Sequence, residues 1–148
     1  MKSILVPVDF SDATPRVIET ARQMAGAFGG RIVLLHVVEP EPDFVGFEPG
    51  PATMRMSVAR DFKAEHLQLD KLKESLTGTG LDVIALQIRG STAEKILHEA
   101  ATHEAGLIVM GSHGHGALYE LLVGSVTTGV LKDARCPVVV VPVRREEP

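Results

Sequence analysis

A glycine-rich stretch near the C-terminus, GSHGHGALYELLVGS, has residue types and a spacing that could do chemistry. It directly follows the apolar run 107–110, and its final pair, Gly124 and Ser125, stands where a helical pattern begins. Glycines let backbone N–H groups point into a cavity, and a helix start adds unpaired donors and a partial positive charge. These features together favour a seat for phosphate groups. A plain turn is the alternative, because glycines after a strand are common turn formers.

A carboxylate and a hydroxyl follow the first apolar run, within residues 9–12. The carboxylate of Asp9 can accept hydrogen bonds from sugar hydroxyls or from an amino group. Alternatively, Asp9 only complements the dipole of the following helix, although Ser11, Asp12 and Thr14 could already cap that helix. No G-K-[ST] occurs in the chain, and no G-x-G-x-x-G follows the first run, so the Walker A and Rossmann dinucleotide motifs are excluded.

Five apolar runs alternate with helical patterns along the chain. The runs, typical of strands buried on both faces, cover residues 4–8, 32–38, 81–88, 107–110 and 138–141. The first helix is expected to have Thr14 as its cap, with an earlier first turn as the alternative, and Phe28 on its inward face. The second helix is expected to cover about 54–77. The third begins at a capping box, Ser91 to Glu94, and ends at Gly106, and the last begins at 124–125.

This alternation predicts an open α/β fold, a five-stranded parallel sheet with helices on both faces. In such sheets a ligand binds beyond the carboxyl ends of the strands, where the winding direction reverses. The residues directly after each strand are therefore the ones that could carry function. They are residues 9–12, 37–39, 89–91 and 111–125.

Length and composition are typical of one globular domain over residues 1–148. A Pro- and Gly-rich loop is expected at about 39–53 and a frayed tail at about 144–148. The net charge of −4, without runs of Lys or Arg, argues against nucleic acid or an anionic membrane as the main partner. Without a membrane-length apolar run, and with Cys136 as the single cysteine, a cytoplasmic location is expected.

The histidines and the cysteine give little support for a metal or a nucleophile. His113 and His115 lack a carboxylate or thiol at a fixed spacing, so no dedicated metal site is expected. His36 lies in a strand and is expected to be a hydrogen-bonded core imidazole, and Cys136 to be a small buried group. No residue can be assigned to an attacking water or a transferring phosphoryl group, so no catalytic residue is assigned.

The glycine-rich stretch closely resembles the nucleotide-binding signature of the universal stress protein family. That signature is a glycine, two residues, a glycine, nine residues, then Gly-Ser or Gly-Thr, and Gly111, Gly114, Gly124 and Ser125 meet every position. The segments ILVPVDFS, IVLLHVV, LIVMGSHG and CPVVVVP are similar to the family in the same order. The resemblance implies a Rossmann-like, adenine nucleotide α-hydrolase-like sheet with strand order 3-2-1-4-5.

The resemblance also implies a binding site for an adenine nucleotide. Asp9 would contact the adenosine part, the backbone of Val37 would read the adenine edge, and glycines with the Val126 N–H would hold ribose and phosphates. Many relatives carry a basic residue where this chain has His115, so phosphate attraction is expected to be weaker or pH-dependent. The implied site residues are Pro7, Val8, Asp9, Val37, Met110, Gly111, Gly114, His115, Gly124, Ser125 and Val126.

The function implied by the resemblance is that of a nucleotide-responsive regulator in the stress response. It would bind ATP, or AMP or ADP, with Mg²⁺ accompanying the phosphates, and would act on an unidentified regulatory partner protein. A homodimer paired through the last strand, residues 138–141, is expected. Two alternatives are a nucleotide-independent interaction module and a slow ATPase or autophosphorylating protein. Adenylating enzymes of the related superfamily are unlike this chain, which has no SGGxDS loop after its first strand.

Overall fold

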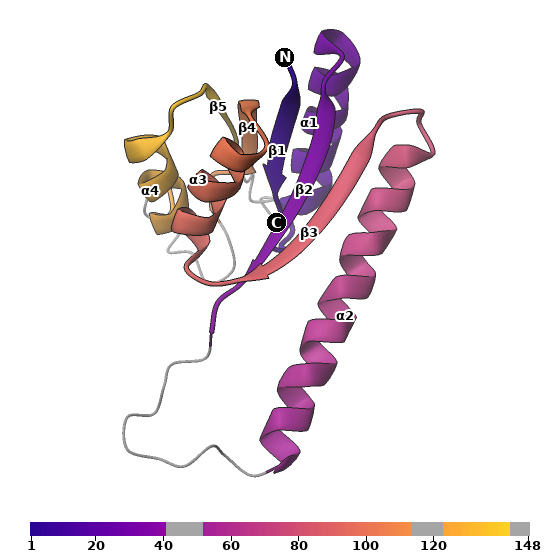
Figure 1. The fold of residues 1–148 in the computed structure, drawn as a ribbon, viewed down its shortest axis with the longest axis vertical. Helices are drawn as coiled ribbons and strands as arrows, with labels where there is room; N and C mark the ends of the chain where they lie inside the picture. The colour runs from indigo at the N-terminus through magenta and orange to yellow at the C-terminus, as the bar shows by residue number, and fades with distance from the viewer. Residues whose placement is uncertain (41–51, 114–122, 143–148) are drawn as a thin grey trace, which may run out of the picture.

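The computed structural model describes residues 1–40, 52–113 and 123–142, with the backbone alone for 52–58. Strands and helices alternate through these residues, as the apolar runs predicted (Figure 1). Most of the expected loop 39–53 and the expected tail 144–148 lie outside the described residues. The elements are β1 (Ser3–Pro7), α1 (Thr14–Phe28), β2 (Arg31–Val38), α2 (Ala52–Thr77), β3 (Val83–Arg89), α3 (Thr92–Thr102), β4 (Ala105–Gly111), α4 (Ser125–Asp133) and β5 (Val138–Val141).

The five strands form one parallel sheet in the order β3-β2-β1-β4-β5, which confirms the expected fold class and strand order. Pro7 is the last residue of β1, where a residue without an N–H does least harm to pairing. The winding direction reverses at β1, because the chain builds outward to β2 and β3 and then returns to place β4 on the other side. The carboxyl ends of β1 and β4 therefore adjoin at the reversal.

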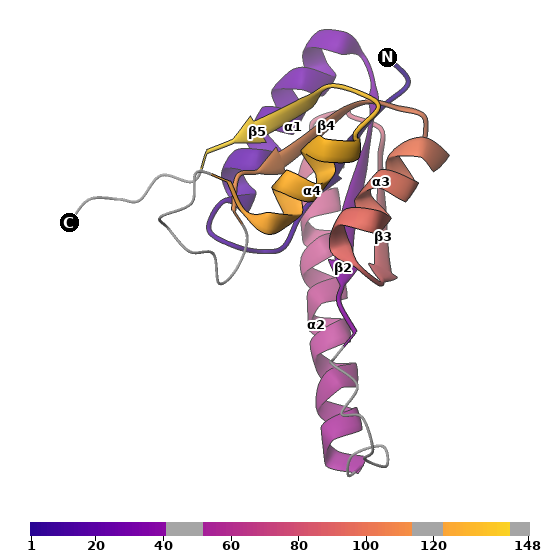
Figure 2. The ribbon, with the colours of Figure 1, turned by 90° about the vertical axis from the view of Figure 1, so that its left-hand side faces the viewer.

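Two apolar layers hold the helices to the sheet. Alternate strand residues face opposite sides, so Ile4 and Val6 join the layer under α1 and α2, while Leu5 joins the layer under α3 and α4. Figure 2 shows α3 and α4 in front of the sheet and α1 behind it. All three side chains are fully buried, and apolar burial of this kind is the main stabilising contribution.

The end of the third helix differs from the sequence prediction. The α-helix ends at Thr102 with His103 as its cap, and Gly106 lies inside β4 rather than closing the helix. The chain turns from α3 into β4 at Glu104, whose φ of 51° lies in the left-handed region where glycine is usually found. Gly106 has a packing reason instead, since an added Cβ would lie 2.9 Å from Cγ of Met1.

The predicted helix caps were wrong in detail. Ala13, not Thr14, is the N-cap of α1, and Ser91 caps α3 without a side-chain hydrogen bond, so the capping box does not form. Gly124 is the N-cap of α4, and Ser125 is its first helical residue. Phe28 is 57% exposed rather than on an inward face, and it is the last residue of α1.

No helix within the described part of the chain combines the length and apolar character needed to cross a membrane.

Candidate functional site

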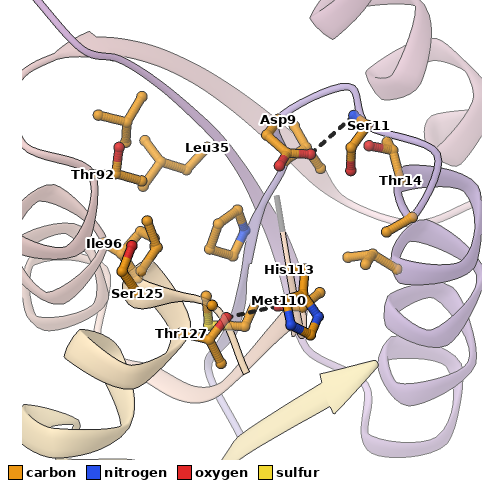
Figure 3. Close-up of a pocket in the computed structure, with 18 of the residues that line it drawn as sticks. Asp9, Ser11, Thr14, Leu35, Thr92, Ile96, Met110, His113, Ser125 and Thr127 are labelled. Carbon is orange, nitrogen blue, oxygen red and sulfur yellow. Dashed lines mark hydrogen bonds between the residues drawn. The ribbon is translucent and has the colours of Figure 1, made fainter. Parts of the chain in front are cut away.

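A cavity of about 580 Å³ opens at the carboxyl ends of β1 and β4, the place where the winding reverses. Figure 3 shows Ser11 and Thr14 on the α1 side, with Thr92, Ile96 and Ser125 across from them. This size is typical of small-molecule sites. Nine of the eleven site residues expected from the sequence line it: Pro7, Val8, Asp9, Val37, Met110, Gly111, Gly124, Ser125 and Val126. The other two, Gly114 and His115, lie outside the described residues.

Asp9 stands on a tight turn between β1 and α1. Its Oδ1 accepts a hydrogen bond of 3.0 Å from the Ser11 N–H, and the Thr14 N–H donates to the Ser11 carbonyl at 3.0 Å. Phe10 completes the turn with a φ of 59°, a left-handed conformation that is uncommon for a bulky residue. Within the described residues Oδ2 of Asp9 has no hydrogen bond, so this oxygen can accept one from a ligand.

The two ends of the glycine-rich stretch lie next to each other. The Gly124 N–H donates to the Ser112 carbonyl at 2.8 Å, and the Thr127 hydroxyl donates to the Gly111 carbonyl at 2.9 Å. Strand β4 and the start of α4 are therefore tied together at the cavity wall. The first N–H groups of a helix have no intrahelical partner, so α4 presents donors and a partial positive charge at its N-terminus.

Several lining residues were not among the expected site residues. The hydroxyls of Ser11 and Thr14 are buried without a hydrogen bond in the described part of the chain, and both residues line the cavity. The Glu39 carboxylate also lines it and accepts a hydrogen bond of 2.9 Å from the Thr92 hydroxyl. In the sequence analysis, the residues directly after strands were the ones expected to carry function. The ranges 9–12 and 37–39 selected in this way include Ser11 and Glu39.

The comparison with family models agrees with this arrangement. The model of the universal stress protein family matches residues 1–142. This chain belongs to the universal stress protein family.

Relatives of known sequence and structure match along nearly the whole chain. A universal stress protein of Thermus aquaticus is 37% identical over 142 residues, covering 95% of this chain and 98% of that protein. The solved structure of MJ0577, from Methanocaldococcus jannaschii, superposes with a TM-score of 0.82 at 28% identity, covering 98% of each chain. The likeness therefore extends through the cavity-forming elements as well as the sheet.

Two solved universal stress proteins with the same fold are complexes with nucleotides. One is bound to cAMP, at a TM-score of 0.70 and 19% identity, and covers 95% of this chain and 96% of that one. The other, from Archaeoglobus fulgidus, is bound to dAMP, at a TM-score of 0.64 and 20% identity, and covers 95% and 97%. Their likeness to this universal stress protein is one of fold.

The charges around the cavity of this universal stress protein are mostly negative. Asp9 and Glu39 contribute carboxylates, and no Lys or Arg occurs among the described lining residues. His113 is the one lining residue in the described ranges that could become cationic. An anionic group bound here would be held by backbone N–H groups and the start of α4 rather than by a fixed side-chain cation.

The remaining candidate groups are placed as follows. His36 is 7% exposed and hydrogen-bonded through both ring nitrogens, which confirms it as a core imidazole. Cys136 is half-buried, and burial raises the pKa of its thiol, which favours the unreactive thiol form. Among residues 1–40, 52–113 and 123–142, no three His, Cys, Asp or Glu side chains are grouped closely enough to hold a metal ion.

Proposed function

We propose that this universal stress protein binds an adenine nucleotide in the cavity between β1, β4 and the start of α4. The observation that carries the proposal is that a carboxylate, Asp9, and a helix N-terminus, α4, lie on one cavity of suitable size. The sugar and the phosphates of a nucleotide need these two groups at opposite ends of one site. The nucleotides bound to universal stress proteins of the same fold support this choice of ligand.

The proposed pose follows from the chemistry of the lining. The adenine ring lies between apolar Val8 and Met110, with its edge on the backbone of Val37. The ribose hydroxyls donate to Asp9, and the phosphates accept from the backbone N–H groups of Ser125 and Val126 at the start of α4. Calorimetry with ATP, AMP and GTP tests the pose, because a backbone N–H and C=O that fit adenine are mismatched to the guanine edge. Equal affinities for ATP and GTP would contradict it.

Mg²⁺ is expected to matter for ATP and not for AMP. The cavity has two carboxylates and no fixed cation among its described lining residues, so the charges of a triphosphate are not neutralised by side chains. Mg²⁺ would neutralise the phosphates while keeping much of its water shell.

Removing Mg²⁺ with a chelator should therefore weaken ATP binding by about tenfold or more, from carboxylate–phosphate repulsion. AMP, the matched ligand with one phosphate, should change by less than about threefold. Calorimetry at constant ionic strength measures both, which keeps salt screening equal. Equal affinities for ATP with and without Mg²⁺ would contradict this expectation.

We further propose that nucleotide occupancy sets the conformation or assembly of a cytoplasmic regulator in the stress response. A ligand can do this only if it binds two states of the protein with different affinities. The segment between β2 and α2 follows Glu39 directly, so a ligand in the cavity lies next to the start of that segment. A regulatory partner protein would bind one of these two states in preference to the other. Capture of such a partner only in the presence of ATP would test this step.

The edge strand β5 is the proposed site of homodimer formation. The Pro137 carbonyl accepts a hydrogen bond of 3.0 Å from Ile108 on β4, and the Val141 carbonyl accepts one of 2.9 Å from Ser112, directly after β4. Backbone groups of alternate residues point to opposite sides of a strand, so Val138 and Val140 direct theirs away from β4. Strand β5 has no second neighbour among the described strands, and such an edge pairs readily with another strand.

Substituting Val140 by Pro tests this dimer with little effect on the β4–β5 pairing. Proline removes an N–H that points to the open edge, and it is tolerated on edge strands. Losing this bond in both protomers should raise the dimer dissociation constant by about tenfold or more. Val140→Thr, which keeps the N–H and the branched side chain, is the matched control. A Val140→Pro protein that is as dimeric as the wild type by light scattering would rule out this interface.

A further inference from the structure

The imidazole of His36 connects three elements behind the cavity. Its Nδ1 lies 2.8 Å from the Val8 carbonyl oxygen, at the end of β1, and its Nε2 lies 2.8 Å from Oε2 of Glu65, on α2. The His36 side chain is 9% exposed and that of Glu65 is 37% exposed. A buried polar group with two short contacts is held in one orientation, because losing either partner would leave it unsatisfied.

Both contacts of the His36 ring are made to oxygen atoms, and this fixes the number of protons. A carbonyl oxygen only accepts, so Nδ1 must donate to Val8. A second proton must lie between Nε2 and the Glu65 carboxyl group to make the other hydrogen bond. A neutral imidazole and an ionised carboxylate hold one proton between them, so the observed geometry requires one more.

The other end of this connection is the turn that carries Asp9. Both backbone groups of Val8 are bonded to residues of β2. Its N–H donates to the Leu35 carbonyl at 2.8 Å, and its carbonyl accepts from the His36 ring. The ring of Phe10 lies 4.6 Å from the His36 ring, at an interplanar angle of 45°. Asp9 stands between these two contacts, so its position depends on the orientation of the imidazole.

We propose that His36 is a positioning residue for Asp9, and that the proton shared with Glu65 tunes the affinity of the cavity for the ribose of its ligand. The proposal rests on the proposed function, because it assumes that Asp9 holds the sugar. With the extra proton, both hydrogen bonds of His36 form and the Asp9 turn is fixed. When that proton is lost at higher pH, one of the two bonds is lost and the turn loosens. Affinity should therefore be greater at low pH and decline as the pH rises.

Other titratable groups near His36 need to be separated from it. On α2, His66 lies beside Glu65 and contacts Asp70 and Gln87, and Gln87 is the register partner of His36 on β3. Arg89, also on β3, lies over the ring of Phe62. On the cavity side, Asp9, Glu39 and His113 line the site itself. Among the described residues, His113 is the imidazole that lines the cavity, so its contribution has to be separated from that of His36 by substitution.

The experiment measures the binding of adenosine by calorimetry between about pH 5 and 8, the range in which imidazoles titrate. Adenosine has no phosphate, so titration of the ligand and of the phosphate end does not contribute. Wild-type affinity should fall by about fivefold to tenfold across this range, as expected for one hydrogen bond. The variant His113→Gln should show the same decline, because His113 lies outside the proposed pair.

Glu65→Gln is the decisive variant, and Glu74→Gln, an exposed carboxylate on the same helix, is its control. A glutamine amide can donate to the unprotonated Nε2, so both bonds of His36 form without the extra proton. Glu65→Gln should bind adenosine at every pH as the wild type does at low pH, and Glu74→Gln should follow the wild type. Glu65 is partly exposed, so neither substitution is expected to prevent folding.

His36 substitutions separate positioning from general damage to the fold. The amide of Asn can reach the place of Nδ1 and keep the bond to Val8, whereas the longer Gln places its amide toward Glu65. His36→Asn should retain adenosine binding within about threefold and lose the pH dependence, and His36→Gln should weaken binding by about tenfold. Binding of 2′,3′-dideoxyadenosine, which has no hydroxyls for Asp9, should be the same in all variants and at every pH.

The outcomes distinguish the two proposals. If wild-type protein binds no adenine ligand, the proposed function fails. If it binds adenosine with one affinity across the pH range, or if Glu65→Gln shows the wild-type decline, His36 does not position Asp9 and the inference is overturned. A decline that is abolished by His113→Gln would also overturn it.

Discussion

Replacing Gly124 by Val should abolish nucleotide binding and leave the fold intact. Gly124 has a φ of −73° and a ψ of 168°, which any residue adopts, and an added Cβ would meet the Ser112 carbonyl oxygen at 3.4 Å and Cα of His113 at 3.5 Å. These are ordinary contacts, so the backbone can accept a side chain. The branched methyl groups of Val would extend into the space before α4 where we place the phosphates.

The expected loss of affinity is on the order of a hundredfold or more, since at least two hydrogen bonds to a charged phosphate would be lost. Gly124→Ala, with a single methyl group, should lose less. The matched control is Gly26→Val, on α1, where an added Cβ meets nothing within 4 Å. Calorimetry with Mg²⁺–ATP and with AMP gives the affinities, and thermal unfolding checks the fold. Wild-type affinity in Gly124→Val would place the phosphates elsewhere.

Replacing Asp9 by Ala should weaken binding of every nucleotide that has ribose hydroxyls. A hydrogen bond to a charged group contributes about 1.5–3 kcal/mol, so the expected loss is roughly tenfold to a hundredfold. Asp9→Asn should lose less, because its amide oxygen can still accept from the Ser11 N–H and hold the turn. The affinities of AMP and of 2′,3′-dideoxy-AMP, measured in both variants and the wild type, form a double-mutant cycle.

The cycle distinguishes a direct contact of Asp9 with the sugar from a role of Asp9 in holding the turn. If Asp9 holds the sugar, the Ala substitution should cost little for the dideoxy ligand, which has no hydroxyl to lose. An equal loss for both ligands would mean that Asp9 acts only through the turn it makes with Ser11. That result would leave the nucleotide proposal standing and remove the sugar contact from it.

Much of the fold was predictable from the period of the apolar residues. The runs at 4–8, 32–38 and 138–141 coincide with β1, β2 and β5 to within a residue, because strands covered on both faces leave a continuous apolar signal. The strand order came from the resemblance to a family, since periodicity alone does not say which strands are neighbours. Here that order placed Asp9 beside the glycine-rich stretch.

The helix ends were less predictable. Gly106 was read as the end of a helix because glycine commonly stands there, but Glu104 adopts the left-handed conformation instead and Gly106 packs against Met1. Ser91 and Glu94 have the spacing of a capping box, yet α3 begins without a side-chain cap. Spacing identifies which cap is possible, and the surrounding contacts decide whether it forms.

The site was predictable where it follows strand ends and not where it depends on distant contacts. Asp9, Gly111 and Gly124 are visible as local motifs. The pairing of His36 with Glu65 joins residues 29 positions apart on a strand and a helix, and no local pattern indicates it. The sequence could indicate only that His36 needed a partner, because a buried imidazole must be hydrogen-bonded.

The most direct test of the central claim is a crystal structure of the protein grown with Mg²⁺–ATP in excess. The account predicts a purine between Val8 and Met110, sugar hydroxyls on the Asp9 carboxylate, and phosphate oxygens on the backbone N–H groups at the start of α4. A nucleotide bound on another face of the molecule, or a cavity that holds only solvent at saturating ligand, would contradict it.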